Sequence, residues 1–432
     1  MVPDMVRMVS CLGVMLSFLA KMGQAQVRFA DHFEPHAMRL DLLHVGTPDR
    51  DEYALDSVRW EPYWGGPYAH LAEMPDLGVH RVSVFDAKTG KLLYRQGYAS
   101  LFAEWQTTGE KLCRAMEEVV RFPWPKMPVD VVIEARKKDG TWREAWRMGV
   151  DPAAYMIDHS VTGFDAKVLE LAVNGPPDAT VDILILGDGY TDAEDEKFSR
   201  DARRFARILF ETAPYRDLKD RISVRAVRAP SRQSGVDEPR RGRFVDTGLS
   251  VTFNTFDSAR YMSTTRMRTL RDLAALAPYD AIMVMANTSR YGGGGIFGQY
   301  AIFPSDNEFD EYVFTHEFGH AFAGLADEYY SSSVAYSDFY PRGVEPWEPN
   351  ITALLPGQPL KWAKYLTKGV PIPTPNDPKY ASVVGVFEGA GYSAKGLFRP
   401  ALDCKMFSKS NVGFCPVCQG AIRDLILLLS DR

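Results

Sequence analysis

The chain has 432 residues, of which 46% are hydrophobic and 25% are charged, and its formal net charge is −6. This length is typical of two domains, and the hydrophobic content is sufficient for two buried cores. The negative charge argues against a nucleic-acid-binding protein, because such proteins usually carry a basic face. Beyond the N-terminus the sequence contains no apolar run long enough for a transmembrane helix, so no membrane span is predicted.

The first residues have the pattern of an export signal. Arg7 supplies a positive charge, Val9–Ala20 is a short apolar run, and Ala25 is a small residue at a suitable cleavage position. Cys11 lies within the apolar run and not at its end, which argues against a lipoprotein. The sequence therefore predicts a signal peptide over residues 1–25 and a secreted or periplasmic mature protein.

Residues 26–150 are predicted to form a β-rich domain. Two short hydrophobic runs on either side of Gly90 indicate a hairpin, and two more flank the turn at Asp139 and Gly140. Six tryptophans are concentrated here, and they are expected to fill the core of a small sandwich and not to form a flat carbohydrate-binding surface. These are Trp60, Trp64, Trp105, Trp124, Trp142 and Trp146.

Turn-forming residues over 151–178 predict a linker, and residues 179–432 are predicted to form a second, α/β domain. Hydrophobic runs predict strands, and helical spacing of apolar residues predicts helices between them. The expected strands are Thr180–Leu186, Ile222–Val227, Ala281–Ala286 and Gln299–Phe303; the expected helices lie near Phe198–Leu209 and Arg266–Ala277.

Two features of this domain lie between residues 292 and 303. Gly292–Gly295 is expected to be a flexible loop, and it does not resemble a phosphate-binding loop because no helix follows it directly. Gln299–Phe303 is then expected to be an edge strand with which an extended substrate could pair through main-chain hydrogen bonds.

The segment after this strand reads His316-Glu317-Phe318-Gly319-His320. On a helix, histidines four residues apart project from one face and can bind a single zinc ion, and the glutamate between them then lies close to the metal. From there Glu317 can act as a general base toward a water molecule. The pattern predicts zinc ligands at His316 and His320 and a catalytic role for Glu317.

A catalytic zinc site usually has a third protein ligand. The chain has eight histidines, and none lies between His159 and the motif or after His320, so a carboxylate is the expected third ligand. Gly324 can end the helix in a left-handed turn and return the chain toward the metal. Asp327 is the first choice because a short side chain suits a tight return; Glu328, or a residue further downstream, is the alternative.

Three of the five cysteines lie close together near the C-terminus. A disulfide between Cys404 and either Cys415 or Cys418 is the expected arrangement in an exported protein. Cys415 and Cys418 could instead be half of a zinc ribbon or a redox pair, but there is no second CxxC and no thioredoxin-like context. Cys113 is expected to be a buried free thiol.

The zinc motif, together with Asp403-Cys404-Lys405-Met406 and Phe414-Cys415-Pro416-Val417-Cys418, resembles the IgA-peptidase family of secreted zinc metallopeptidases. The N-terminal region, for example Thr89–Tyr94 and Gly97–Thr108, is similar to that family's β-sandwich domain. The resemblance implies an α/β (α+β) metzincin-like zinc peptidase domain preceded by a β-sandwich. It also implies that Met406 forms a turn beneath the metal.

The function predicted from the sequence is therefore that of an exported zinc-dependent endopeptidase with Zn²⁺ as cofactor and a protein or peptide as substrate. Tyr329, Tyr330 and Tyr392 are candidates for stabilising the oxyanion. Two alternatives are a glycan- or cell-wall-binding protein with a vestigial metal domain and a zinc hydrolase of a non-peptide amide. Residues from about 331 to 400 are rich in Pro, Gly and Tyr and are expected to form loops around the cleft.

Overall fold

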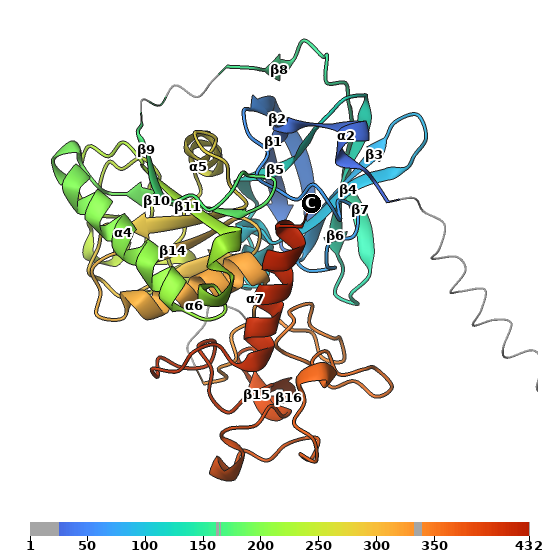
Figure 1. The fold of residues 1–432 in the computed structure, drawn as a ribbon, viewed down its shortest axis with the longest axis vertical. Coiled ribbons are helices and arrows are strands. Elements are labelled where there is room, and N and C mark those ends of the chain that lie inside the picture. The colour runs from blue at the N-terminus through green and yellow to red at the C-terminus, as the bar shows by residue number, and fades with distance from the viewer. Residues whose placement is uncertain (1–25, 161–163, 165, 332–338, 432) are drawn as a thin grey trace, which may run out of the picture.

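The computed structural model describes residues 26–160, 164, 166–331 and 339–431. The predicted signal peptide, residues 1–25, lies outside them. In the described part of the chain no helix is long and apolar enough to cross a membrane. The fold is mixed α/β, with an N-terminal β-rich domain beside a larger α/β domain (Figure 1).

The N-terminal domain consists of two four-stranded sheets, with strand orders β5-β1-β2-β8 and β4-β3-β6-β7. Buried side chains from both sheets, such as Leu40, Val84, Phe122 and Ile133, belong to one hydrophobic core, as in a β-sandwich. The strands are β1 (Phe33–Thr47), β2 (Arg50–Glu61), β3 (His80–Asp86), β4 (Leu92–Tyr98), β5 (Arg114–Pro125), β6 (Val129–Arg136), β7 (Trp142–Val150) and β8 (Ile157–Asp158). Two short helices, α2 (Phe29–His32) and α3 (Leu101–Trp105), accompany them.

Both predicted hairpins of this domain are confirmed, because β3 pairs with β4 and β6 pairs with β7, antiparallel in each case. The six tryptophans divide into two groups. Trp64, Trp105 and Trp124 are buried, as expected for core residues. The other three are partly exposed, and the guanidinium groups of Arg81 and Arg136 lie 4.3 and 4.2 Å from the ring centroid of Trp142.

The second domain contains a six-stranded sheet with the order β13-β14-β12-β10-β11-β9. The four inner strands run parallel, and the two edge strands, β13 and β9, are antiparallel to their neighbours. The strands are β9 (Val168–Ala172), β10 (Val181–Asp188), β11 (Ile222–Arg228), β12 (Ala281–Ala286), β13 (Gly294–Ile296) and β14 (Tyr300–Pro304). All predicted strands of this domain are therefore present.

Helices cover both faces of the sheet. Successive residues of a strand point to opposite faces, so Ile183 and Ile185 of β10 pack in the core with α4 (Asp195–Glu211) and α6 (Asp310–Ala323). Leu184 and Leu186 pack in the core on the other face, with α5 (Met267–Ala274). This burial on both faces explains why the strand sequences are almost continuously apolar.

Two expectations about residues 292–303 are wrong. β14 is not an edge strand, because it lies between β12 and β13. The true edge is β13, which includes part of the glycine run that was expected to be a flexible loop. In addition, the stretch 151–178 that was expected to be a linker contributes a strand to each domain, since β8 pairs with β2 and β9 pairs with β11.

From residue 339 to residue 415 the described chain is mostly loops, as expected, with one hairpin formed by β15 (Phe387–Ala390) and β16 (Ser393–Arg399). Helix α7 (Pro416–Leu429) then runs from this region to the N-terminal domain (Figure 1). There Asp431 lies 2.9 Å from Nε2 of His70. Short 3-10 helices are η1 (Asp192–Glu194), η2 (Arg216–Arg221), η3 (Pro239–Arg241), η4 (Thr255–Asp257), η5 (Ala363–Tyr365) and η6 (Pro378–Tyr380).

The cysteines differ from the expectations. Cys113 is exposed and not buried, because it lies in an exposed stretch just before the buried part of β5. The disulfide expected at Cys404 is not formed: Cys404, Cys415 and Cys418 are free thiols, and the Sγ atoms of Cys404 and Cys418 are 3.8 Å apart. All three are nevertheless buried together.

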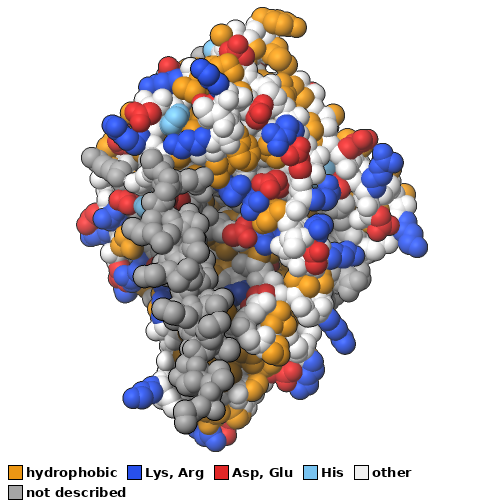
Figure 2. Space-filling model, turned by 90° about the vertical axis from the view of Figure 1, so that its right-hand side faces the viewer, with side chains coloured by type: hydrophobic (Ala, Val, Ile, Leu, Met, Phe, Trp, Pro, Cys, Tyr) orange, Lys and Arg blue, Asp and Glu red, His pale blue; other side chains and the backbone are white. Residues whose placement is uncertain are grey.

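The surface shown in Figure 2 has acidic and basic side chains interspersed, not gathered into one charged patch. This pattern is common on proteins that do not bind nucleic acid through that face. The absence of a nucleic-acid partner stays a prediction.

A buried ion network joins the two domains. Arg39 of β1 is 1% exposed and forms hydrogen bonds with Asp41 and Glu61 in its own domain and with Asp272 of α5, at 2.7 Å, in the other. Such a network holds the sheet of one domain against a helix of the other.

We expect Arg39→Ala to lower the free energy of unfolding by about 3–5 kcal/mol, because it leaves buried carboxylates without their partner. Denaturant unfolding followed by circular dichroism measures this. Arg28→Ala is the control, since Arg28 is 77% exposed and its ion pair is 3.8 Å long, and it is expected to change stability by less than about 1 kcal/mol. Equal effects of the two changes would contradict the structural role of Arg39.

Candidate active site

Helix α6 carries His316, Glu317 and His320, the three residues of the predicted zinc motif. It ends where Gly324 adopts φ 61° and ψ 31°, so the expected left-handed turn is confirmed. The amide of Gly324 donates to the carbonyl of His320 at 3.1 Å, and that of Leu325 donates to the carbonyl of Gly319 at 3.2 Å. These bonds satisfy the last carbonyls of the helix and turn the chain back along it.

The two histidine rings are oriented by backbone carbonyls. Nδ1 of His316 lies 3.0 Å from the carbonyl of Lys405, and Nδ1 of His320 lies 2.5 Å from the carbonyl of Leu325. A carbonyl oxygen only accepts hydrogen bonds, so each Nδ1 carries a proton, and in the neutral ring Nε2 is left with a free lone pair. The two Nε2 atoms are 3.1 Å apart.

The returning chain brings Asp327 to the histidines. Its Oδ1 lies 3.1 Å from Nε2 of His316 and 3.3 Å from Nε2 of His320. Its Oδ2 accepts a hydrogen bond from the hydroxyl of Tyr392 at 2.6 Å. The neighbouring Glu328 is directed elsewhere, since its Oε1 lies 3.2 Å from Sγ of Cys418.

The three converging atoms have the geometry of a metal site. A tetrahedral zinc ion with bonds of roughly 2.0–2.1 Å has ligand atoms about 3.3–3.4 Å apart, close to the spacing of the two Nε2 atoms and Oδ1 of Asp327. Among the described residues this Oδ1 has no hydrogen-bond partner. When both histidines are neutral, their Nε2 atoms and this Oδ1 are three acceptors that face one another, and a bound cation would satisfy all three.

Burial and the neighbouring charges shift the pKa values of the acids and bases in the site. Burial raises the pKa of Glu317, and the neighbouring histidines only partly offset this. Burial would lower the pKa of His320, but the carboxylate of Asp327 outweighs it and raises the pKa to about 9. Burial would likewise raise the pKa of Asp327, yet the two histidines hold it well below its usual value.

Glu317 is partly exposed toward a cavity of about 470 Å³ that is also lined by both histidines and Asp327. The N-terminal domain forms one wall of this cavity, through Ala103 and Glu104 of α3 and through Arg136 at the end of β6. This role was not predicted from the sequence, because no local pattern shows which segment of one domain faces a site in another.

The edge strand β13 forms a second wall of the cavity, in very close contact with helix α6. A Cβ atom on Gly293 would lie 2.6 Å from Oε1 of Glu317, and one on Gly295 would lie 2.6 Å from the carbonyl of Glu317. Only glycine allows this approach. The glycine run is therefore a packing requirement beside the candidate general base.

The three candidate tyrosines have different surroundings. Tyr392 is engaged with Asp327, as described above, and the ring of Tyr330 lies near that of Phe407 and does not line the cavity. Tyr329 lines the cavity, and its hydroxyl is 3.4 Å from a guanidinium nitrogen of Arg260. Arg260 also lines the cavity and was not singled out from the sequence, since an arginine in an irregular segment carries no recognisable signal.

Met406 lies in a tight turn, and its Sδ would be 3.1 Å from a Cβ atom on Gly319 of α6. The same turn supplies the carbonyl of Lys405 that orients His316. The turn expected at Met406 thus packs directly against the helix that carries the motif.

Another group with possible metal ligands lies in the N-terminal domain and consists of His44, Asp51 and His80. Here the ring of His44 already has partners on both sides, with Nδ1 2.9 Å from Glu118 and Nε2 2.9 Å from Asp51. An imidazolium between two carboxylates accounts for this group without a metal.

Comparison with known families agrees with the resemblance. The family described as IgA Peptidase M64 matches residues 169–379 and 376–426, and the family described as Peptidase M64 N-terminus matches residues 28–147. The chain therefore belongs to the IgA peptidase M64 family and has the function class of a peptidase. A search of the curated proteins found no match.

We expect Gly293→Ala to lower peptidase turnover strongly, because the added methyl group displaces the carboxylate of Glu317. Gly413→Ala is the matched control, since a Cβ atom there meets nothing within 4 Å. Turnover and circular dichroism spectra are measured for both variants. A fully active Gly293→Ala protein would show that Gly293, just before β13, does not fix the position of Glu317.

Proposed function

We propose that this member of the IgA peptidase M64 family is an exported zinc-dependent endopeptidase with a metzincin-like catalytic domain. The observation that carries the proposal is the triangle formed by Nε2 of His316, Nε2 of His320 and Oδ1 of Asp327, with edges of 3.1–3.3 Å. These three side chains would hold the ion. Glu317 lies on α6 between the two histidines, and it lines the cavity that these three side chains also line.

When bound, zinc would act as a Lewis acid toward the scissile carbonyl and a water molecule. The chain's own residues supply the proton transfers. Glu317 accepts a proton from the attacking water and passes it to the leaving amine. Tyr392 holds Asp327 in place through its hydroxyl, and the carbonyl of Lys405 holds the ring of His316, which is the usual way in which outer partners fix metal ligands.

Arg260 and Tyr329 are proposed to stabilise the oxyanion, because both line the cavity that holds the histidines and Glu317. Hydrogen-bond donors fixed in advance at such a position lower the barrier of acyl transfer. The edge strand β13 supports a peptide as substrate, since an extended chain can lie along a sheet edge. The predicted signal peptide supports export of the mature protein.

We expect Glu317→Gln to retain zinc while turnover falls by about 10²–10⁴-fold, the usual share of general acid–base catalysis. Asp327→Ala removes a ligand, so zinc affinity itself is expected to fall and added zinc to restore part of the activity. Digestion of a peptide library with and without a zinc chelator, together with metal analysis of each variant, measures both effects. Normal zinc affinity in Asp327→Ala would overturn the assignment of the third ligand.

The same digest separates the proposed endopeptidase from its alternatives. A protein that cleaves no peptide bond but binds glycans would favour the vestigial metal domain, and hydrolysis of simple amides alone would favour the non-peptide hydrolase.

Tyr329→Phe is expected to lower kcat by about 10²–10³-fold with a smaller change in KM, because an oxyanion donor acts mainly in the transition state. Zinc content should not change. Tyr330→Phe is the control, since this neighbouring side chain does not line the cavity. A loss of similar size in both variants would indicate a structural effect of the tyrosines and would contradict the catalytic role of Tyr329.

A further inference from the structure

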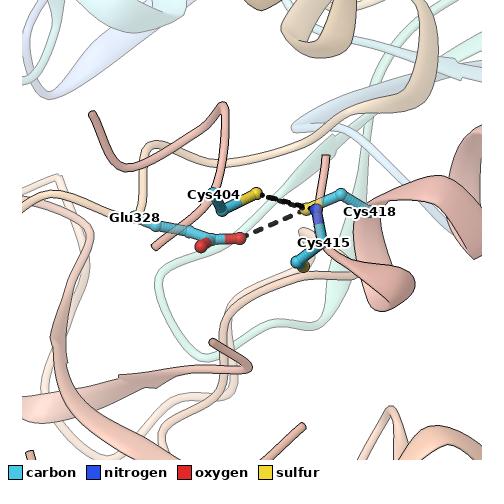
Figure 3. A group of neighbouring side chains, drawn as sticks. All are labelled: Glu328, Cys404, Cys415 and Cys418. Atoms are coloured by element: carbon cyan, nitrogen blue, oxygen red, sulfur yellow. Dashed lines mark hydrogen bonds between the residues drawn. The ribbon is translucent and has the colours of Figure 1, made fainter. Parts of the chain in front are cut away.

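A further group of side chains that could hold a metal ion lies next to the candidate active site and consists of Glu328, Cys404, Cys415 and Cys418. Figure 3 shows these side chains converging from three separate segments of the chain. One ligand atom from each lies within 4.8 Å of the others. Glu328, Cys404 and Cys418 are 0% exposed and Cys415 is 6% exposed, so the group is enclosed by protein.

The distances within the group fit a tetrahedral ion. The Sγ atoms of Cys404 and Cys418 are 3.8 Å apart, and Oε1 of Glu328 is 3.2 Å from Sγ of Cys418. For zinc–sulfur bonds of about 2.3 Å the edge of a tetrahedron is about 3.8 Å, and with one oxygen ligand it shortens to about 3.5 Å. These two distances are thus close to those of a zinc coordination shell, and the other ligand atoms lie within 4.8 Å of one another.

Glu328 supplies an independent observation. Although fully buried, its Oε2 has no hydrogen-bond partner in the described part of the chain. Its Oε1 accepts a hydrogen bond from the side-chain amide of Asn350 at 3.0 Å, which orients the carboxylate toward the cysteines. A buried carboxylate oxygen without a partner is costly, and a bound cation would remove this cost.

Burial raises the pKa of Cys404 and Cys418, and the backbone around the cysteines partly offsets this. Cys415 is the N-cap of α7, Cys418 lies in the first turn of that helix, and the amide of Cys415 donates to Sγ of Cys404 at 3.2 Å. The positive end of a helix dipole and backbone N–H groups stabilise deprotonated sulfur, which is the form that binds a metal.

We propose that Glu328, Cys404, Cys415 and Cys418 form a closed structural site for one Zn²⁺ ion. Three thiolates select a soft or borderline ion and disfavour Mg²⁺ and Ca²⁺, which take oxygen ligands. Four protein ligands leave no open position for substrate or water, so the site is structural and not catalytic. It is distinct from the site at His316, His320 and Asp327 and does not depend on it.

The proposed ion would fix two segments that form the active site. Glu328 follows Asp327 directly, and its amide donates to the carbonyl of Met406 at 2.8 Å. Cys404 begins the turn whose next residue, Lys405, accepts the hydrogen bond from His316. Loss of this ion is therefore expected to loosen Asp327 and the support of His316 at the same time.

Zinc content measured in the full mature chain tests the proposal. The wild-type protein, purified with zinc in the medium, should contain two zinc ions per chain, and the double variant His316→Ala/His320→Ala should retain one. After Co²⁺ replaces zinc, that double variant should show a thiolate-to-cobalt charge-transfer band in the near ultraviolet. Cys404→Ser/Cys418→Ser should lose this band and one zinc ion.

Two further measurements cover the case in which the cysteine variant does not fold. A mercurial thiol reagent added to the folded His316→Ala/His320→Ala protein should release its remaining zinc to a coloured indicator. The milder change Glu328→Gln should weaken zinc retention against a chelator. Glu348→Gln is its matched control, because Glu348 is also a buried glutamate with an unpartnered Oε2 but lies outside the group.

The proposal is overturned if the histidine double variant contains no zinc while remaining folded. It is also overturned if mass spectrometry of the unreduced protein finds Cys404 joined by a disulfide to Cys415 or Cys418. If the wild-type protein holds only the zinc bound by the cysteines, this proposal stands and the zinc peptidase proposal fails, so the two failures are distinguishable. Cys113→Ser, at an exposed cysteine outside the group, should leave the zinc content unchanged.

Discussion

The reversal of the chain at Gly324 is the constraint on which the candidate active site depends. A left-handed residue ends α6 one turn after His320 and sends the following segment back along the helix. In this segment Asp327 faces the two histidines, and the next residue, Glu328, faces the three cysteines. One backbone turn therefore distributes two adjacent carboxylates between two groups of potential metal ligands.

The turn at Lys405 and Met406 supports this arrangement from the other side. One of its carbonyls orients the ring of His316, and the next accepts the amide hydrogen of Glu328. The side chain of Met406 packs where Gly319 leaves room on α6. Metal ligands usually need such outer partners to keep their geometry. Here the partners come from a segment about ninety residues downstream of His316. Cys404 connects this segment to the N-terminal end of α7 through the hydrogen bond from the amide of Cys415.

The N-terminal domain takes part in the site and does not merely precede it. The ion network around Arg39 joins it to α5, and residues at the end of β6 and around α3 form one wall of the cavity. Together with β13 and the loops after residue 339, this wall limits what can approach Glu317. Both domains therefore line the space into which Glu317 opens, and surface loops and domain boundaries usually carry most of the binding specificity of a protein.

The sequence alone determined the parts that depend on local spacing. Two histidines four residues apart, a glycine able to adopt positive φ and apolar runs bounded by turns each specify a short piece of backbone, and the structure has the helix, its left-handed end and the strands that they predict. Only the tertiary structure decided which carboxylate meets the histidines, which strand forms the sheet edge, that Arg260 lies at the cavity, and that Cys404, Cys415 and Cys418 meet Glu328 as free thiols. These are contacts between segments distant in sequence, and their geometry is set by how whole elements pack, which no local pattern of residues encodes.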